Sequence, residues 1–298
     1  MTKRERKKPV GHEWRHVENK KLVYTVYFVL RLSVIVMLVA QIFNQNYENV
    51  LLCVLTLALF MLPSAFERRL HIDLPDTLEI IILLFIYAAE ILGEISDYYI
   101  EFPFWDTMLH TMNGFLCAAI GFALVDILNQ EEKVALHLSP FFMAVVAFCF
   151  SMTVGVLWEF FEFSMDQFLL FDMQKDTILS TISTVNLDPN HGTTAVAVKG
   201  IQDVILVLED GTQMPLGLGG YLDVGIIDTM KDLFVNFIGA VVFSTIGYFY
   251  VKGRGKGNFV TRFIPRLQRK PASQAENAPD APAQEGSGQD SSLAETAE

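Results

Sequence analysis

Five carboxylates and one imidazole lie near the ends of long apolar segments, where burying a charge is costly. They are Asp106, His110, Glu159, Glu162, Asp228 and Asp232. Within each segment these residues are three or four positions apart, and in a helix such residues share one face. Ionisable groups inside a membrane segment usually face a cavity or a partner. We therefore expect the six side chains to converge in one polar site.

The composition of this set indicates two ways to accommodate so many negative charges. The carboxylates can bind a divalent ion, or they can be protonated, with a hydrogen bond between His110 and an aspartate. One imidazole among carboxylates suits Zn²⁺, Mn²⁺ or Fe²⁺ better than an all-oxygen Mg²⁺ or Ca²⁺ site. The candidate metal ligands are His110, Asp106, Glu159, Asp228 and Asp232. Glu162 is the candidate catalytic residue, which would orient a bound water or accept its proton.

Simpler roles compete for some of these and other acidic residues. Asp106 and Asp228 each begin a D-T-M tripeptide near the start of an apolar segment, and Asp is a favoured N-cap residue. Glu94, Asp97 and Asp166 lie near the expected water interface, where solvation alone explains them. Neither capping nor solvation explains His110, Glu159, Glu162 and Asp232, which lie inside the apolar segments.

Six apolar segments carry these residues in a chain of 298 residues, 52% of them hydrophobic. They are residues 22–43, 47–66, 76–96, 104–128, 137–164 and 228–250. Most reach the ~18 to 20 residues that span a bilayer core of ~30 Å. The sequence therefore predicts an all-α polytopic membrane protein with six transmembrane helices. We expect no cleavable signal peptide, because the first apolar segment is long enough to span the membrane.

Lys and Arg are concentrated at the two ends of the membrane domain. Eight precede Leu22 and seven follow Val251. Because Lys and Arg in short loops mark the cytoplasmic side, both termini are expected in the cytoplasm and residues 165–227 outside it. The basic flanks, residues 1–21 and 251–270, are expected to attract anionic lipid rather than nucleic acid.

The parts outside the membrane domain, residues 22–250, differ from it in composition. Residues 271–298 are rich in Ala, Pro, Gln, Ser and acids, and we expect this acidic tail to be disordered. Residues 165–227 form an extracytoplasmic insertion between the fifth and sixth helices. Its stretch VILVL-EDGT-QMPL predicts a β-hairpin that turns at Asp210 and Gly211. We expect a small β-containing cap at the mouth of the polar site.

Small and aromatic residues in the segments have structural interpretations. Close helix packing is expected at the small residues Gly114, Ala118, Gly121, Gly239 and Ala240. Trp105 and Trp158 lie at the expected depth of the membrane interface, where an aromatic belt is the default interpretation.

Three motifs occur together and in order along the second half of the chain. They are D-x-x-x-H at Asp106–His110, W-E-x-x-E at Trp158–Glu162, and D-T-x-x-D at Asp228–Asp232, with Gly239-Ala240 following. This arrangement, over about residues 100–250, resembles the YjdF-like family of bacterial inner-membrane proteins. The D-x-x-x-H helix start also has a more remote likeness to VanZ-like envelope proteins. The resemblance implies a bacterial multi-pass cell-membrane protein with a shared polar site, and it supplies no reaction.

Three functions are compatible with these features. The familiar signatures H-E-x-x-H and G-x-S-x-G, the Walker loop and paired cysteines are absent from the sequence. The leading interpretation is a metal-dependent enzyme acting on an envelope lipid or lipid-linked molecule. The others are an ion or proton translocator and a structural or accessory membrane protein. A continuous relay across the membrane lacks support, because only Glu79 and Asp126 lie near the inner ends of the segments.

Overall fold

The computed structural model describes residues 20–70, 72–130, 138–253, 262–263 and 266–267. The predicted basic N-terminal segment up to residue 19 lies outside the described residues. So do most of the predicted juxtamembrane segment and the whole of the predicted disordered tail.

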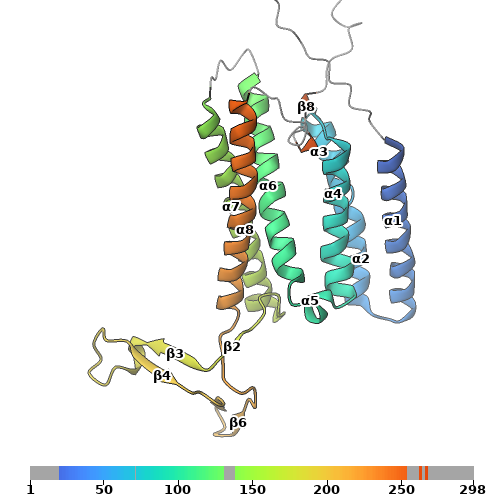
Figure 1. The fold of residues 1–298 in the computed structure, drawn as a ribbon. Helices are drawn as coiled ribbons and strands as arrows, with labels where there is room; N and C mark the ends of the chain where they lie inside the picture. Colours follow the sequence, from blue (N-terminus) through green and yellow to red (C-terminus); the bar gives the residue numbers. More distant parts are fainter. Residues whose placement is uncertain (1–19, 71, 131–137, 254–261, 264–265, 268–298) are drawn as a thin grey trace, which may run out of the picture. The chain divides into compact units, whose positions relative to one another are not determined.

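Helices make up most of the described chain (Figure 1). They are α1 (Lys20–Phe43), α2 (Tyr47–Leu59), α3 (Leu62–Leu70), α4 (Asp76–Tyr87), η1 (Ala88–Ile95), α5 (Tyr98–Glu101), α6 (Trp105–Gln130), α7 (Pro140–Leu169) and α8 (Ile226–Lys252). Within the described residues, five helical stretches are long and apolar enough to cross a membrane. These are α1, the stretch from Tyr47 to Arg69, α6, α7 and α8. The protein is therefore a multi-pass helical membrane protein.

The predicted third span, residues 76–96, is built in two parts. The α-helix α4 has 12 residues and is followed directly by η1, a π-helix of 8 residues. The backbone stays helical at the junction, with φ −63° and ψ −41° at Tyr87. Neither part alone reaches the ~20 residues that a spanning helix needs. A sixth membrane span, formed by residues 76–96, thus stays a prediction. The hydrogen-bonding pattern of this stretch changes from α-helical to π-helical at its middle.

The ends of α7 and α8 differ from the predicted boundaries. α7 begins after Ser139, whose side chain caps the Phe142 N–H, and it continues to Leu169, beyond the predicted end at 164. α8 begins after Gly225. The insertion is therefore shorter than the predicted 165–227 and comprises residues 170–225.

The alternative in which Asp106 and Asp228 serve as N-caps is wrong. Asp106 is the second residue of α6, and Asp228 is the third residue of α8. The residue that precedes α8 is Gly225, in the left-handed conformation and without a side-chain cap. A role in capping therefore does not account for either carboxylate.

Helices α6, α7 and α8 pack against one another, and α1, α2, α4 and η1 form a second set of contacts (Figure 1). Between α6 and α8 the backbones almost touch. A Cβ atom added at Gly114 would lie 2.1 Å from the Asn236 carbonyl oxygen, and one added at Gly239 would lie 2.1 Å from the Thr111 carbonyl oxygen. The predicted close packing at these two glycines is confirmed, and it brings the first turns of α6 and α8 together.

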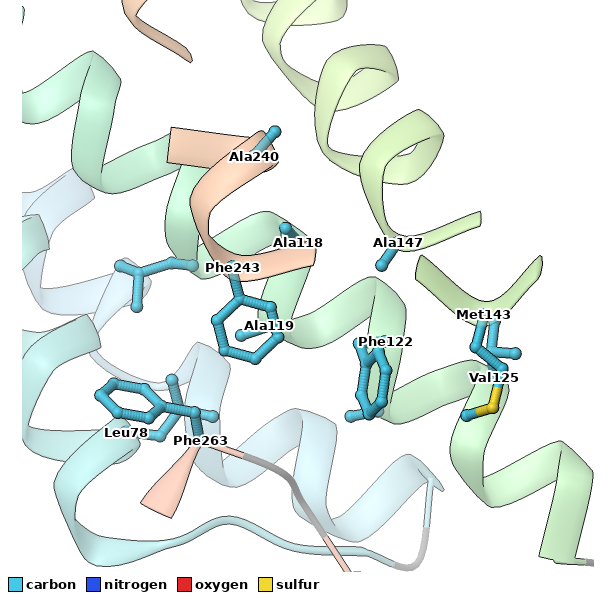
Figure 2. Packing of buried hydrophobic residues seen from close by; sticks show 12 residues of the cluster. Leu78, Ala118, Ala119, Phe122, Val125, Met143, Ala147, Ala240, Phe243 and Phe263 are labelled. Atoms are coloured by element: carbon cyan, nitrogen blue, oxygen red, sulfur yellow. The ribbon is translucent and has the colours of Figure 1, made fainter. Parts of the chain in front are cut away.

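The apolar core between α6, α7 and α8 is built from aromatic rings set against small residues (Figure 2). Phe122 and Phe243 are fully buried, and Ala118, Ala147 and Ala240 leave room for them. A second cluster joins α1, α2 and α4 around Val34, Cys53, Phe60 and Leu83. Many large apolar side chains on the outer helix faces remain exposed, as expected for helices that face lipid.

The insertion carries three antiparallel strand pairs. They are β2 (Ile178–Leu179) with β7 (Tyr221–Leu222), β3 (Thr181–Thr184) with β4 (Val196–Lys199), and β5 (Ile205–Val207) with β6 (Gln213–Pro215). A short 3-10 turn, η2 (Val185–Leu187), follows β3, and β1 (Ile72–Asp73) pairs with β8 (Arg266–Leu267) elsewhere in the chain.

The hairpin predicted from VILVL-EDGT-QMPL is confirmed by β5 and β6. Leu206 lies opposite Met214, and the Leu208 N–H donates to the Thr212 carbonyl across the turn. Hydrogen bonds from the backbone and then the side chain of Thr212 lower the pKa of Asp210 in this turn. The insertion is therefore β-containing, as predicted.

Candidate functional site

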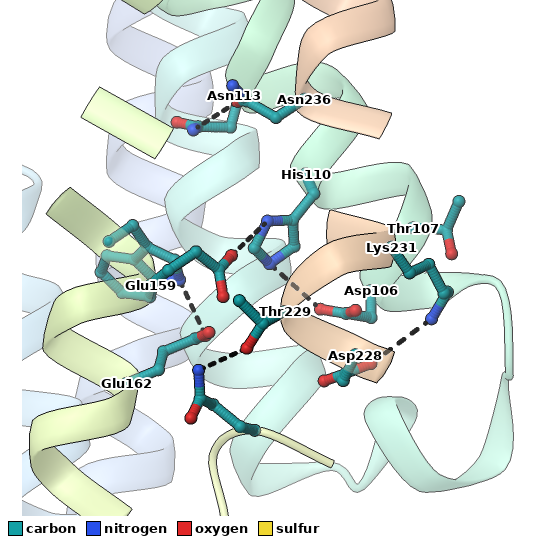
Figure 3. A network of polar contacts seen from close by, with 12 residues as sticks. Asp106, Thr107, His110, Asn113, Glu159, Glu162, Asp228, Thr229, Lys231 and Asn236 are labelled. Carbon is teal, nitrogen blue, oxygen red and sulfur yellow. Dashed lines mark hydrogen bonds and ion pairs between the residues drawn. The ribbon is translucent and has the colours of Figure 1, made fainter. Parts of the chain in front are cut away.

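The first two turns of α6 supply an aspartate and the histidine. Asp106 and His110 are four residues apart, and the His110 Nε2 atom lies 3.4 Å from Asp106 Oδ1. On the other edge of the ring, the Nδ1 atom lies 3.7 Å from Oε1 of Glu159, which α7 contributes. Figure 3 shows the imidazole between these two carboxylates. Each ring nitrogen thus faces one acidic side chain.

Two further carboxylates complete the surroundings of the ring. Asp232 of α8 joins Asp106 and His110 in one group, and Glu162 of α7 joins His110 and Glu159 in another. Within each group, one ligand atom per residue lies within 4.8 Å of the others. We call these five residues, Asp106, His110, Glu159, Glu162 and Asp232, the carboxylate–imidazole cluster. The sequence prediction named all five.

Four members of the cluster are buried and the fifth, Asp106, is partly exposed, with 24% of its side chain accessible. The exposed fractions are 8% for His110, 4% for Glu159, 8% for Glu162 and 2% for Asp232. Asp106 Oδ2, Glu159 Oε2 and Asp232 Oδ1 are buried without a hydrogen-bond partner among the described residues. An unsatisfied buried polar atom costs about 1–3 kcal/mol, and a charged one costs more. Binding of a proton or a cation would therefore stabilise these oxygens.

At the Nε2 edge of the ring, the distance to Asp106 fits shared coordination of an ion better than direct hydrogen bonding. An N–H···O hydrogen bond measures about 2.7–3.2 Å, and both nitrogen–oxygen distances, 3.4 and 3.7 Å, are longer. Two ligands that each lie about 2.1 Å from a tetrahedral ion are about 3.4 Å apart. The donor set of one imidazole and several carboxylates also suits Zn²⁺, Mn²⁺ or Fe²⁺. The residues present therefore fit a divalent ion.

Trp158 has a partner that the sequence did not reveal. Its indole Nε1 donates a 2.8 Å hydrogen bond to Glu162 Oε1. Sequence reasoning assigned Trp158 to an aromatic belt, although its spacing of four residues from Glu162 was a usable signal. The bond orients the Glu162 carboxylate and occupies one of its two oxygens.

Asp228, the sixth predicted site residue, lies outside both groups of the cluster. Its Oδ2 accepts a 2.9 Å hydrogen bond from the Lys175 backbone N–H, and its Oδ1 lies 3.5 Å from Lys231 Nζ (Figure 3). Asp228 therefore links Lys175, which follows α7 in the sequence, to the start of α8 by a hydrogen bond.

Residues 173–177, which we call the strap, follow the end of α7 in the sequence and are hydrogen-bonded to Asp228 at the start of α8. Asp166, expected to be merely solvated, instead accepts the backbone N–H groups of Met173 and Gln174 at 2.7 and 2.9 Å. The Thr177 N–H donates to Asp223 at 2.6 Å. Carboxylates from α7, α8 and the insertion thus hold the strap in place.

The surroundings of the strap are acidic. Burial, followed by the negative charges of Asp172, Asp223 and Asp166, raises the pKa of Asp176, and Lys175 opposes this shift. The end of the helices that carries the cluster is therefore negative, which favours cations nearby.

On its other side the cluster borders a layer of neutral amides. Asn113 donates a 3.1 Å hydrogen bond to Asn236, which is 1% exposed (Figure 3). Ser151 donates to the Gly114 carbonyl at 2.7 Å. Further along α6 and α8 lie the rings of Phe122 and Phe243. The ionisable groups of this site are therefore confined to one end of the helices.

Comparisons with known proteins agree with the membrane architecture. A family model described as "Predicted membrane protein (DUF2238)" matches residues 26–253. An uncharacterized protein of Thermotoga maritima is 26% identical over 124 residues, which are 40% of this chain and 62% of that protein. The chain thus covers less than two thirds of this relative. No solved structure matches the chain.

Proposed function

The chain belongs to the DUF2238 family of predicted membrane proteins, and we propose that it is a divalent-metal-dependent enzyme acting on an envelope lipid or lipid-linked molecule. The observation that carries the proposal is the placement of the His110 imidazole between buried carboxylates from three helices, with unpartnered oxygens around it. The motif resemblance to YjdF-like proteins agrees with this family membership.

The ion is assigned to the Nε2 side of the ring. Asp106 lies on that side, and Asp232 belongs to the same group as Asp106 and His110. Together the two aspartates contribute two of the cluster's three oxygens that are buried without a hydrogen-bond partner among the described residues. The opposite nitrogen, Nδ1, faces Glu159 at 3.7 Å, and a ligating histidine usually gives its second N–H to such a carboxylate. A bound divalent ion would activate water and polarise a carbonyl or phosphoryl oxygen.

Glu162 is the proposed proton acceptor. The Trp158 hydrogen bond holds its Oε1, so Oε2 is the oxygen available to take a proton from a reacting water. Glu162 also belongs to the group around Nδ1, close to His110 and Glu159. Glu162 thus lies beside the His110 ring, on the edge opposite the assigned ion, and is not assigned as a ligand.

The position of the site within the helices supports a lipid substrate. His110 lies about 7.5 Å from the first residue of α6, at a rise of 1.5 Å per residue. On the same turns of α7 as Glu159 and Glu162, the side chains of Phe160 and Phe161 are exposed. A substrate anchored in the bilayer can therefore meet the cluster at headgroup depth.

A structural role is the second candidate, and the Asn113–Asn236 hydrogen bond between α6 and α8 favours it. In that version no ion binds, and Asp106 and Asp232, which each have an oxygen within 4.8 Å of the other's, share a proton, since two carboxylates can hydrogen-bond only when one is protonated. A translocator has less support, because the neutral amides and the Phe122–Phe243 core follow the cluster along the helices.

The test uses purified, metal-loaded protein incubated with extracted bacterial envelope lipids, which are then compared by mass spectrometry. We expect wild-type protein to deplete a lipid species. We expect Glu162→Gln to keep its metal but react about 100-fold more slowly, the typical effect of removing a general base. Glu101→Gln, a change at an exposed glutamate of α5, serves as the control. Unchanged lipids with the wild type, or full activity in Glu162→Gln, would contradict the proposal.

A further inference from the structure

The Nδ1 edge of the His110 ring faces two glutamates of α7. Glu159 Oε1 lies 3.7 Å from Nδ1, and Glu162 belongs to the same group, whose ligand atoms lie within 4.8 Å of one another. Within the described part of the chain, neither glutamate forms an ion pair with Lys or Arg, and Lys231 of α8 pairs with Asp228 instead. No described Lys or Arg therefore offsets the negative charge on this edge.

Glu159 has one buried oxygen that accepts no hydrogen bond from a described residue. The residue is 4% exposed, and its Oε1 faces the ring, whereas its Oε2 is buried without a partner among the residues that the structure describes. Glu162 differs, because its Oε1 accepts the Trp158 indole N–H. A buried carboxylate oxygen is stable only when it is hydrogen-bonded or paired with a cation. A positively charged N–H donor would supply both at Glu159 Oε2.

The proposed divalent ion offsets only part of the charge of the cluster. The ion carries two positive charges and is assigned to the Nε2 edge, where Asp106 lies and where Asp232 belongs to the same group. These two aspartates balance the ion when both are ionised, and the charges of Glu159 and Glu162 remain. Buried charges are normally paired with an opposite charge. A second positive group is therefore expected at the Nδ1 edge.

We propose that Glu159 and Glu162 recognise a primary ammonium group in the headgroup of the lipid substrate, with one ammonium N–H donating to Glu159 Oε2. The inference rests on the proposed function and names the substrate class of that same site. An ammonium group carries a positive charge and several N–H donors, as the lysine side chain does. A quaternary ammonium has the charge but no N–H, so it cannot satisfy the Glu159 oxygen. The site should therefore select an ethanolamine-type headgroup over a choline headgroup.

Two exposed aromatic rings lie next to these glutamates on α7. The rings of Trp158 and Phe161 are 5.3 Å apart between centroids, and both side chains are exposed. The hydrogen bond from the Trp158 indole to Glu162 places this ring directly beside one of the two carboxylates. Aromatic faces attract ammonium groups. The exposed pair therefore favours the approach of a cationic headgroup from the outer face of α7.

The inference is tested by titrating zinc-loaded protein in detergent with short-chain phosphatidylethanolamine and phosphatidylcholine, which have the same acyl chains and differ only in N-methylation. We expect the wild type to bind the ethanolamine lipid about 10-fold more tightly or better, the effect of one hydrogen bond between charged groups. Glu159→Gln should reduce this preference to less than about 2-fold, because the charged acceptor is gone. Glu101→Gln, at an exposed glutamate of α5, should keep the preference of the wild type.

The comparison is a ratio between two lipids that share a phosphate, so a lower zinc occupancy in a variant would weaken both and leave the ratio unchanged. Glu159→Asp keeps the charge and should retain part of the preference, which separates recognition from misfolding. Free phosphoethanolamine should bind more weakly than the lipid, and equal affinities would overturn the assignment to a lipid headgroup.

A wild type that binds zinc and depletes a lipid but does not distinguish the two headgroups would overturn the inference and leave the proposed function in place. So would an unchanged preference in Glu159→Gln, or a second divalent ion per chain that occupies the Nδ1 edge. A wild type that binds no metal and depletes no lipid would overturn both.

Discussion

The indole Nε1 of Trp158 donates a 2.8 Å hydrogen bond to Oε1 of Glu162, one turn further along α7. The two side chains differ in exposure, with Trp158 at 42% and Glu162 at 8%. An aromatic residue at the rim of the site therefore orients a buried carboxylate beside His110. The first and last residues of the W-E-x-x-E motif, Trp158 and Glu162, are thus joined by a hydrogen bond.

Replacing Trp158 by Phe should slow the proposed reaction and leave the metal bound. A hydrogen bond to a charged group contributes about 1.5–3 kcal/mol, so its loss predicts a decrease of about 10- to 100-fold in lipid turnover. Trp105→Phe is the matched control, because the Trp105 indole donates to the Ala88 carbonyl instead of to the cluster. Turnover and metal content measured together check the prediction. An equal loss of turnover in both variants would argue against a specific role for Trp158.

Asp228 and Asp232 lie one turn apart on α8 but are expected to have different functions. Asp232→Asn should lose most of the bound metal, because it removes a proposed ligand whose Oδ1 has no hydrogen-bond partner in the described part of the chain. Asp228→Asn should keep the metal and instead loosen the strap, which makes the Lys175 N–H exchange faster with solvent. Metal analysis combined with hydrogen exchange separates the two. Metal loss in Asp228→Asn with retention in Asp232→Asn would reverse the assignment.

Two glycines of α8 should differ in their tolerance of a methyl group. At Gly239 the added Cβ meets the Thr111 backbone oxygen at 2.1 Å, whereas at Gly247 it meets the Phe122 ring at 2.8 Å. A ring can rotate away, but the backbone of a packed helix cannot. We expect Gly239→Ala to destabilise the protein by more than the ~1–3 kcal/mol typical of overpacking and Gly247→Ala to fall within that range. Denaturant unfolding in detergent measures both, and equal stability losses would contradict this packing.

The orientation of the chain is predicted from its Lys and Arg distribution and is open to direct labelling. In a background without the three native cysteines, a cysteine at Gly211 should react with an impermeant reagent from outside the cell. One at Ser273 should react only after the cells are opened. Labelling of position 211 only from the inside would place the proposed site on the cytoplasmic face.

The sequence predicted the helices well because a membrane span needs only length and hydropathy. It also identified the five members of the cluster, since helical spacing and the cost of buried charge single them out. The hairpin of β5 and β6 followed from its Asp210-Gly211 turn. These features depend on local patterns that a single sequence contains.

Features that depend on tertiary contacts were missed or misread. Hydropathy does not distinguish a π-helix such as η1 from an α-helix. Gly93 of η1 lies against the Tyr99 ring, and no periodic pattern in the sequence predicts this contact. Gln174 lies in a loop, where Asp166 accepts its backbone N–H and its side chain donates to Thr229 on α8. Asp228 was predicted from its spacing alone, which does not show that its carboxylate accepts the Lys175 N–H and lies 3.5 Å from Lys231 Nζ.

The most direct test of the central claim is metal analysis of the purified protein, wild type beside His110→Ala. His191→Ala, at an exposed histidine of the insertion, is the control. We expect about one divalent ion per chain in the wild type and in His191→Ala, as befits a single set of ligands, and almost none in His110→Ala. The ion should also stabilise the wild type, by about 2.7 kcal/mol at a concentration 100 times its Kd. A wild type without bound metal, or a His110→Ala variant with the same metal content and stability, would contradict the claim.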